Sequence, residues 1–127
     1  YMNDIGLFVS MLEQGTQGDI LRGNLLGYKG AIFENLAASI LYKMGRKLFY
    51  FRKDSGLEID FVIRHKGECT LLEVKSETGN AKSVKTILNH PEKYHVNKAI
   101  KFGNYNVGNT GSVLTLPLYM LMFVDER

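Results

Sequence analysis

Two stretches of the chain carry a helical spacing of apolar residues, and the part between them carries a strand spacing. In residues 25–44 the apolar positions recur every three or four residues, and Gly45 stands where a left-handed C-terminal cap belongs. Residues 80–89 show the same period, with Asn80 in the place of an N-cap and Pro91 beyond the last turn. We expect a helix in each stretch. The first is apolar nearly all round, which predicts packing on more than one side.

Three strands are predicted between these helices. Residues 47–53 are rich in aromatic side chains and end in a turn-forming cluster at 54–56. Residues 58–64 alternate apolar and polar positions, and residues 69–74 form the next strand after a short link that contains Gly67. Such a short link predicts an antiparallel hairpin.

The two ends of the chain complete the expected architecture. Residues 1–24 combine apolar clusters with a stretch rich in Gly, Gln and Thr, which predicts a short helical arm followed by a loop. Residues 98–102 predict a short strand and residues 116–124 a long apolar one, joined through a loop rich in Gly and Asn at 103–111. The order of helix, three strands, helix and further strands predicts an α/β or α+β fold, with a mixed sheet flanked by helices.

Composition narrows the class of protein but not its chemistry. A length of 127 residues with 45% hydrophobic and 23% charged residues is typical of one soluble globular domain, and no apolar run approaches a membrane span. The net charge of +3 permits nucleic-acid binding without arguing for it. The single Cys69 cannot form an intramolecular disulfide, and we expect it to be a small buried hydrophobe in a reducing, cytoplasmic compartment.

Ionised residues inside the predicted hairpin are the first sign of a functional site. If the turn centres on Lys66 and Gly67, residues whose numbers sum to 133 face each other, so Asp60 lies opposite Glu73 with Cβ atoms about 5 Å apart. Lys75 lies two residues after Glu73 and therefore points to the same side. Directly opposed carboxylates destabilise a plain hairpin, which implies a cation between them or partial protonation of one.

A third acid, Glu34, lies in the middle of the first predicted helix on a segment expected to be largely buried. We hypothesise that Asp60 and Glu73 ligate Mg²⁺, with the Val74 carbonyl as a further oxygen, and that Glu34 orients a water molecule. Lys75 would polarise that water or stabilise charge on a scissile phosphate. Glu58 is a rival ligand on the face of Asp60, although its place beside a turn predicts solvent exposure.

Each of these residues also has a simpler interpretation, which stays open. Glu73 and Lys75 can be an edge-strand charge pair, Asp60 can lie on a solvated strand face, and Glu34 can be an acid on a helix surface. Other site types are disfavoured, because the three histidines lack the spacing of a helical zinc site and no P-loop or dinucleotide fingerprint occurs. The ordered set of helix acid, strand acid and Glu-x-Lys favours a site.

That ordered set resembles a known superfamily. Glu34, Asp60 and the run Glu73-Val74-Lys75, in the order αβββαβ, resemble the core of the PD-(D/E)XK nucleases, which include restriction enzymes and Holliday-junction resolvases. No Pro precedes Asp60, where the superfamily's name would place one. More closely, the chain resembles the C-terminal domain of unknown function of prokaryotic AAA-type ATPases, in residues 3–7, 30–35, 58–62 and 72–75.

The resemblance implies a fold, a division of the chain and a chemistry. Residues 25–127 would form a restriction-endonuclease-like domain, and residues 1–24 would be an arm left from the connection to an upstream P-loop ATPase. The resemblance implies Mg²⁺-dependent hydrolysis of DNA phosphodiester bonds, with Mn²⁺ as a substitute ion. Asp60 and Glu73 would be the metal ligands, Lys75 the catalytic lysine and Glu34 the helix acid.

The implied partners are DNA and the protein's own ATPase domain, where alone ATP would bind, with no membrane involved. The oligomeric state is left open. The alternative function is a non-catalytic interaction or regulatory module of a AAA-type ATPase that uses the nuclease-like fold as a scaffold. The run at 117–122 and the N-terminal arm could supply apolar docking surface for such a module, although both are more simply core.

Overall fold

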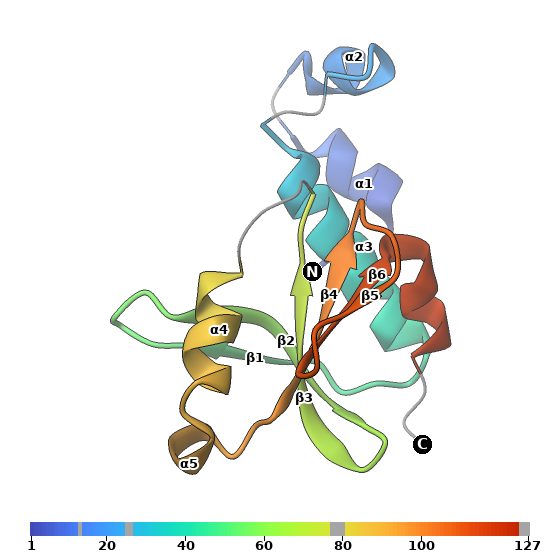
Figure 1. Ribbon diagram of the computed structural model, residues 1–127. Coiled ribbons are helices and arrows are strands. Elements are labelled where there is room, and N and C mark those ends of the chain that lie inside the picture. The colour runs from blue at the N-terminus through green and yellow to red at the C-terminus, as the bar shows by residue number, and fades with distance from the viewer. Residues whose placement is uncertain (13, 25–26, 77–80, 125–127) are drawn as a thin grey trace.

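A six-stranded mixed sheet lies at the centre of the protein, as the computed structural model shows for residues 1–12, 14–24, 27–76 and 81–124 (Figure 1). The order of the strands across the sheet is β1-β2-β3-β4-β6-β5. β3 pairs with β4, and β4 with β6, in parallel; the other neighbours are antiparallel. The strands are β1 (Phe49–Arg52), β2 (Glu58–His65), β3 (Glu68–Val74), β4 (Lys98–Gly103), β5 (Gly108–Asn109) and β6 (Val113–Pro117). The predicted α/β class with a mixed sheet is therefore confirmed.

The β2–β3 hairpin has the predicted register. Lys66 and Gly67 both adopt positive φ angles, of 50° and 79°, which is the conformation of a two-residue type I′ turn. Every pair in the ladder, from His65 opposite Glu68 to Phe61 opposite Leu72, sums to 133. Continued by one residue, this register places Asp60 opposite Glu73.

Helix α3 (Lys29–Lys43) packs on one face of the sheet. It ends at a left-handed Gly45 with φ of 77°, as predicted, and the Arg46 N–H donates to the Leu41 carbonyl in a Schellman-type cap. The side-chain amide of buried Asn35 accepts a hydrogen bond from the Met2 N–H and donates one to the Met2 carbonyl. These bonds tie the N-terminal segment, which leads into α1 (Ile5–Ser10), to this helix. The core of this face comprises Ala37, Ala38, Leu41, Phe61, Ile63, Leu72, Val74, Ile100, Phe102, Leu116, Leu121 and Val124.

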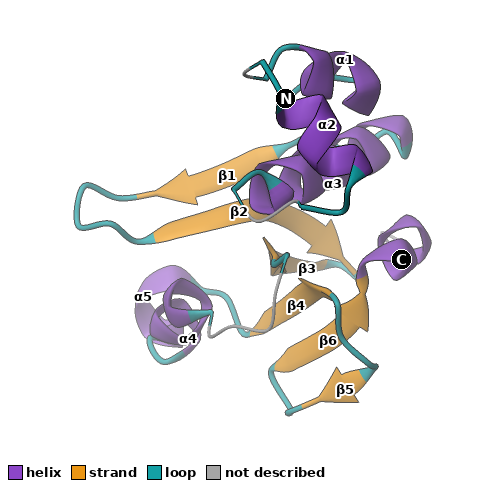
Figure 2. Cartoon of the chain, turned by 90° about the horizontal axis from the view of Figure 1, so that it is seen from above, coloured by secondary structure: helices purple, strands orange, loops and turns teal. Residues whose placement is uncertain are grey.

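The opposite face of the sheet is covered by α4 (Lys82–Leu88) and the short α5 (Pro91–Tyr94), as Figure 2 shows. Val84 and Ile87 of α4 pack on Leu71 and Ala99. Ala81 occupies the cap position of α4 and makes no side-chain cap. The expected cap residue, Asn80, lies outside the described residues.

The ends of the chain differ from the predictions. The predicted strand at 116–124 is wrong, because β6 ends at Pro117 and the 3-10 helix η1 (Leu118–Phe123) follows. Leu121 is buried there while Tyr119, Met122 and Phe123 are exposed, so an apolar run that looked like a buried strand is in part surface. The loop expected after the N-terminal helix contains α2 (Thr16–Leu21), and the loop predicted at 103–111 contains the edge strand β5.

Within the described ranges, no helix is long and apolar enough to cross a membrane. The division into an arm at 1–24 and a domain at 25–127 stays a prediction.

Candidate active site

The four residues predicted to form a site line one cavity. It has a volume of about 360 Å³ and lies between α3, the end of β3 and the first turn of α4. The lining residues are Glu34 of α3, Glu58 and Asp60 of β2, Glu73 of β3, Lys75 directly after β3, and Lys82 and Ser83 of α4. The fold therefore brings residues of two helices, α3 and α4, to the β2–β3 hairpin.

Asp60 is held against β3 through its side chain. Its Oδ2 atom accepts a hydrogen bond of 2.7 Å from the Val74 N–H. The side chain of Asp60 thus makes a bond to β3 at the point where the backbone pairing of the two strands ends. The next residue, Lys75, donates its backbone N–H to the Phe102 carbonyl of β4 at 2.8 Å. These bonds fix the backbone on which the acidic pair and the lysine stand.

Glu73 and Lys75 form an ion pair in which only the lysine reaches solvent. Lys75 Nζ lies 2.5 Å from Glu73 Oε1, and the side chains are 35% and 6% exposed. The second carboxylate oxygen, Glu73 Oε2, is buried and has no hydrogen-bond partner among the described residues. Because a buried carboxylate oxygen normally has a partner, an unpaired one is an unusual and costly feature.

The pKa values of Asp60, Glu73 and Glu34 are all raised, which favours the protonated form. Burial raises the pKa of Asp60, although the Val74 N–H and Lys75 act against it. Burial also raises the pKa of Glu73, and the nearby charge of Asp60 raises it further, against the effects of Lys75 and of the Asp60 backbone N–H. The pKa of Glu34 is raised by burial first and then by the charge of Asp60. Burial and mutual repulsion therefore make these carboxylates costly to ionise together.

The pKa values of Lys75 and Tyr1 are also raised by the neighbouring acids. Burial acts to lower the pKa of Lys75, but its bond to Glu73 outweighs this, so the pKa is raised and the side chain is an ammonium at neutral pH. Burial, followed by the charges of Glu34 and Asp60, raises the pKa of Tyr1 to about 12. The cavity thus has four carboxylates and two lysines in its lining, and Lys75 is the lysine paired with one of the acids.

Lys82, Ser83 and Tyr1 are neighbours of this cluster that sequence reasoning missed. Ser83 Oγ accepts a hydrogen bond of 3.3 Å from the N–H of Glu58, which is exposed as predicted. One signal was available for Lys82 and Ser83: a helix that follows the Glu-x-Lys strand must begin near the end of that strand. No sequence pattern pointed to Tyr1.

The donor set suits a hard divalent cation. Asp60 and Glu73 offer carboxylate oxygens, one of them unpaired, and oxygen ligands are those that Mg²⁺ prefers. Within the described ranges, no three side chains of His, Cys, Asp or Glu form a ready-made metal cage. An ion held by two carboxylates would keep several waters, which is the common mode for Mg²⁺ and an uncommon one for structural zinc.

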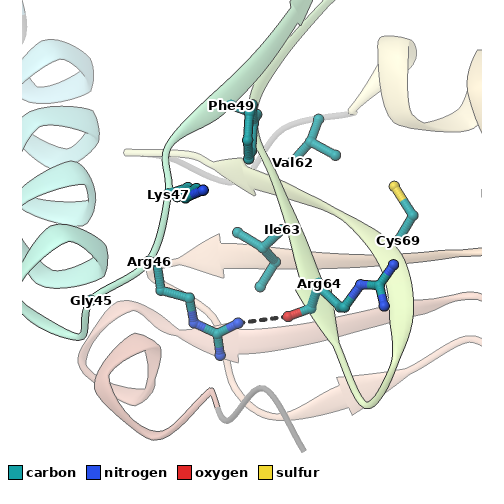
Figure 3. A pocket seen from close by; sticks show the side chains of 8 residues that line it. All are labelled: Gly45, Arg46, Lys47, Phe49, Val62, Ile63, Arg64 and Cys69. Atoms are coloured by element: carbon teal, nitrogen blue, oxygen red, sulfur yellow. Dashed lines mark hydrogen bonds between the residues drawn. The ribbon is translucent and has the colours of Figure 1, made fainter.

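A second cavity lies at the other end of the hairpin and has a different character. It has a volume of about 430 Å³ and contains no carboxylate in its lining (Figure 3). Arg46 is one of its lining residues, and its guanidinium donates to the Arg64 carbonyl at 2.6 Å and to the Val124 carbonyl at 2.5 Å. Cys69 also lines this cavity and is exposed, so the prediction of a buried cysteine is wrong. It lies opposite Arg64 in the β2–β3 ladder, close to the turn.

Comparisons with known proteins give one match. No curated protein and no solved structure matches the chain. The family described as a domain of unknown function (DUF4143) matches residues 29–119, a range that holds α3, the whole sheet and every predicted site residue. Since this range covers most of the chain, the protein belongs to the DUF4143 family.

Proposed function

We propose that this domain is a Mg²⁺-dependent nuclease that hydrolyses DNA phosphodiester bonds and forms the C-terminal part of a larger ATPase. The proposal assigns metal binding to Asp60 and Glu73, and supporting roles in the reaction to Lys75 and Glu34. It extends the resemblance of these residues, in their order along the chain, to the PD-(D/E)XK nucleases.

The observation that carries the proposal is the unpaired oxygen of Glu73. Glu73 Oε2 is buried without a hydrogen-bond partner among the described residues, and Asp60 is close enough to raise the pKa of Glu73. A purely structural ion pair would satisfy both oxygens or remain exposed. Asp60 and Glu73 both line the cavity, and between them they have one lysine, Lys75, as a close counter-charge. A divalent cation would supply the missing positive charge and a partner for the unpaired oxygen.

Each residue has a role that follows from its position. Asp60 and Glu73 would hold the ion, and the Val74 N–H orients Asp60 for this. A bound Mg²⁺ supplies Lewis acidity towards a phosphoryl oxygen and favours the ionisation of water. Lys75, an ammonium fixed by Glu73, would stabilise the negative charge that develops on the scissile phosphate. Glu34, with its raised pKa, is suited to accept or orient a proton of the attacking water.

A cleavage assay tests the proposal. The domain is incubated with plasmid, linear and branched DNA in Mg²⁺, in Mn²⁺ and in EDTA. We expect ion-dependent cleavage that falls by a factor of about 10² or more in both Asp60→Ala and Lys75→Ala, as is usual when a charge-stabilising group is removed. Asp54→Ala and Lys98→Ala are matched controls, because both residues are exposed and outside the cavity. Intact substrates under all conditions would contradict the proposal.

A second candidate function is a docking module for the ATPase or a partner, and the exposed apolar residues favour it. Met11 of the N-terminal arm is 71% exposed, and Tyr119 and Phe123 of η1 are 67% and 72% exposed. Large apolar side chains on a surface are typical of interaction sites. This function predicts normal folding, no ion binding and no cleavage. The sequence upstream of Tyr1 tests the link to an ATPase directly, because a Walker motif is expected there.

A further inference from the structure

A basic cavity adjoins the candidate active site and shares two of its lining residues. It has a volume of about 410 Å³ and lies between the turn that joins β1 to β2 and the helices α4 and α5. Lys82 and Ser83 line both cavities, so the two form neighbouring parts of one surface. Figure 2 shows α4 and α5 beside the far end of the β1–β2 pair, away from α3.

The charges of the two cavities are opposite. Three lysines, Lys53, Lys82 and Lys93, line the basic cavity, and its lining contains no carboxylate. The candidate active site is lined by four carboxylates, with Lys75 paired to Glu73. The Ser83 hydroxyl stands among the lysines as a further hydrogen-bond donor, whereas the Thr86 hydroxyl donates to the Lys82 carbonyl at 3.0 Å. Ammonium and hydroxyl groups in this combination suit a phosphate.

Two of the lysines are held around a single tyrosine ring. Lys53 Nζ lies 5.0 Å from the centre of the Tyr94 ring and donates to its hydroxyl at 3.3 Å. Lys93 Nζ lies 5.4 Å from the same ring, which packs edge-on against Phe51 at 6.0 Å. Tyr94 therefore contacts both ammonium groups, and all three side chains line the cavity. Like charges so placed form a ready counter-charge for an anion.

The neighbouring acids do not cancel this charge. Glu92 lies beside His90 at 3.3 Å and is exposed, and neither residue lines the cavity. Glu58 lines the candidate active site, and its backbone N–H is bound to Ser83. Asp54 is exposed in the turn and is absent from the lining.

We infer that the basic cavity binds a backbone phosphate of the nucleic-acid strand whose neighbouring phosphodiester lies at Asp60 and Glu73. This inference rests on the proposed function and names how its substrate is held. The acidic cavity by itself repels a polyanion, so a nucleic acid needs a cationic contact beside it. Lys53, Lys82 and Lys93 supply that contact without sequence readout, because phosphate contacts position a strand and do not identify its bases.

The inference is tested by DNA binding without cleavage. Fluorescence anisotropy of a labelled DNA duplex and of its single strand is measured in EDTA, at several salt concentrations on the order of 0.1 M. For Lys53→Gln/Lys93→Gln we expect an affinity loss of about tenfold and a salt slope smaller by about one, because one phosphate contact is lost. The control, Lys47→Gln/Lys66→Gln, removes the same charge from exposed residues outside both cavities and should change neither value by as much.

The outcomes separate this inference from the proposed function. Binding that depends on Lys53 and Lys93, together with an absence of cleavage in Mg²⁺, would uphold the cavity and refute the nuclease. Equal losses in the two double variants, or no binding by the wild type, would overturn the inference. Inorganic phosphate and a mononucleotide serve as competitors, and displacement of DNA by either at micromolar concentration would indicate a site for a free anion instead. Lys82→Gln, an exposed single change, covers the case in which the double variant does not fold.

Discussion

Two glutamates of β3 form ion pairs with lysines outside the strand, and only one of these pairs belongs to the candidate active site. Glu68, near the hairpin turn, contacts Lys98 of β4 at 2.8 Å, and both side chains are about half exposed. Glu73, at the other end of the same strand, contacts Lys75 at 2.5 Å, with its side chain 6% exposed. The residue types and distances are alike, but the burial differs.

Burial changes what the pair can do. An exposed pair such as Glu68–Lys98 has both groups hydrated and contributes little to stability. Burial raises the pKa of Glu73 and that of Asp60, and Glu73 Oε2 is left without a partner among the described residues. A Glu-x-Lys pattern therefore gains chemical meaning from β2, which supplies Asp60, and from α3, which supplies Glu34.

Removal of the lysine from each pair should show the largest difference in stability. Lys75→Met leaves Glu73 buried beside Asp60 without its counter-charge, and we expect the free energy of unfolding to fall by about 2–3 kcal/mol. Lys98→Met should lower it by less than about 1 kcal/mol. Urea unfolding at neutral pH in EDTA measures both values. Equal losses would show that the two pairs do not differ in the way their burial implies.

Removal of the Asp60 charge should raise the free energy of unfolding, by less than Lys75→Met lowers it. In Asp60→Asn the amide oxygen can still accept the Val74 N–H, while the repulsion with Glu73 disappears. We expect the free energy of unfolding, in EDTA at neutral pH, to rise by about 1 kcal/mol, as is common when a functional site is neutralised. Asp54→Asn, in the exposed turn, should stay within about 0.5 kcal/mol of the wild type. A loss of stability in Asp60→Asn would mean that the charge of Asp60 serves structure.

The pH dependence of stability gives the smallest of these effects. A carboxyl whose pKa is raised on folding binds more protons in the folded state, so its contribution makes stability fall as pH rises above the ordinary value. The ordinary values are 3.8 for Asp60 and 4.5 for Glu34 and Glu73, and all three are raised. Between about pH 5 and about pH 8 in EDTA, the wild type should lose about 0.5 kcal/mol more stability than Asp60→Asn. Parallel curves for the two proteins would contradict the shifted pKa of Asp60.

The β2–β3 hairpin could be predicted from sequence because its determinants are local. Lys66-Gly67 between two alternating segments fixes a two-residue turn, and the turn fixes the register. From that register, the pairing of Asp60 with Glu73 and the side of Lys75 follow by arithmetic. The cap at Gly45 is likewise written in a few adjacent residues.

What sequence could not supply depends on tertiary contacts. The run at 116–124 is apolar throughout, and only the packing of Leu121 into the core separates a 3-10 helix from a strand. Cys69 is exposed although Leu71, two residues further along β3, packs with Val84 and Ile87 of α4, and no local pattern separates the two positions. The basic cavity combines the β1–β2 turn with α4 and α5, and no local pattern shows that these segments meet. The functional roles of Glu34, Asp60, Glu73 and Lys75 stay predictions.

Divalent-ion binding tests the central claim most directly. Titration calorimetry with Mn²⁺ and with Mg²⁺ is run on the wild type, on Asp60→Asn and on Asp54→Asn as the matched control. We predict one site in the wild type and in Asp54→Asn, and its loss in Asp60→Asn, because the site needs both carboxylates. Ion binding that is absent from the wild type, or equal in all three proteins, would contradict the claim that Asp60 and Glu73 form a metal site.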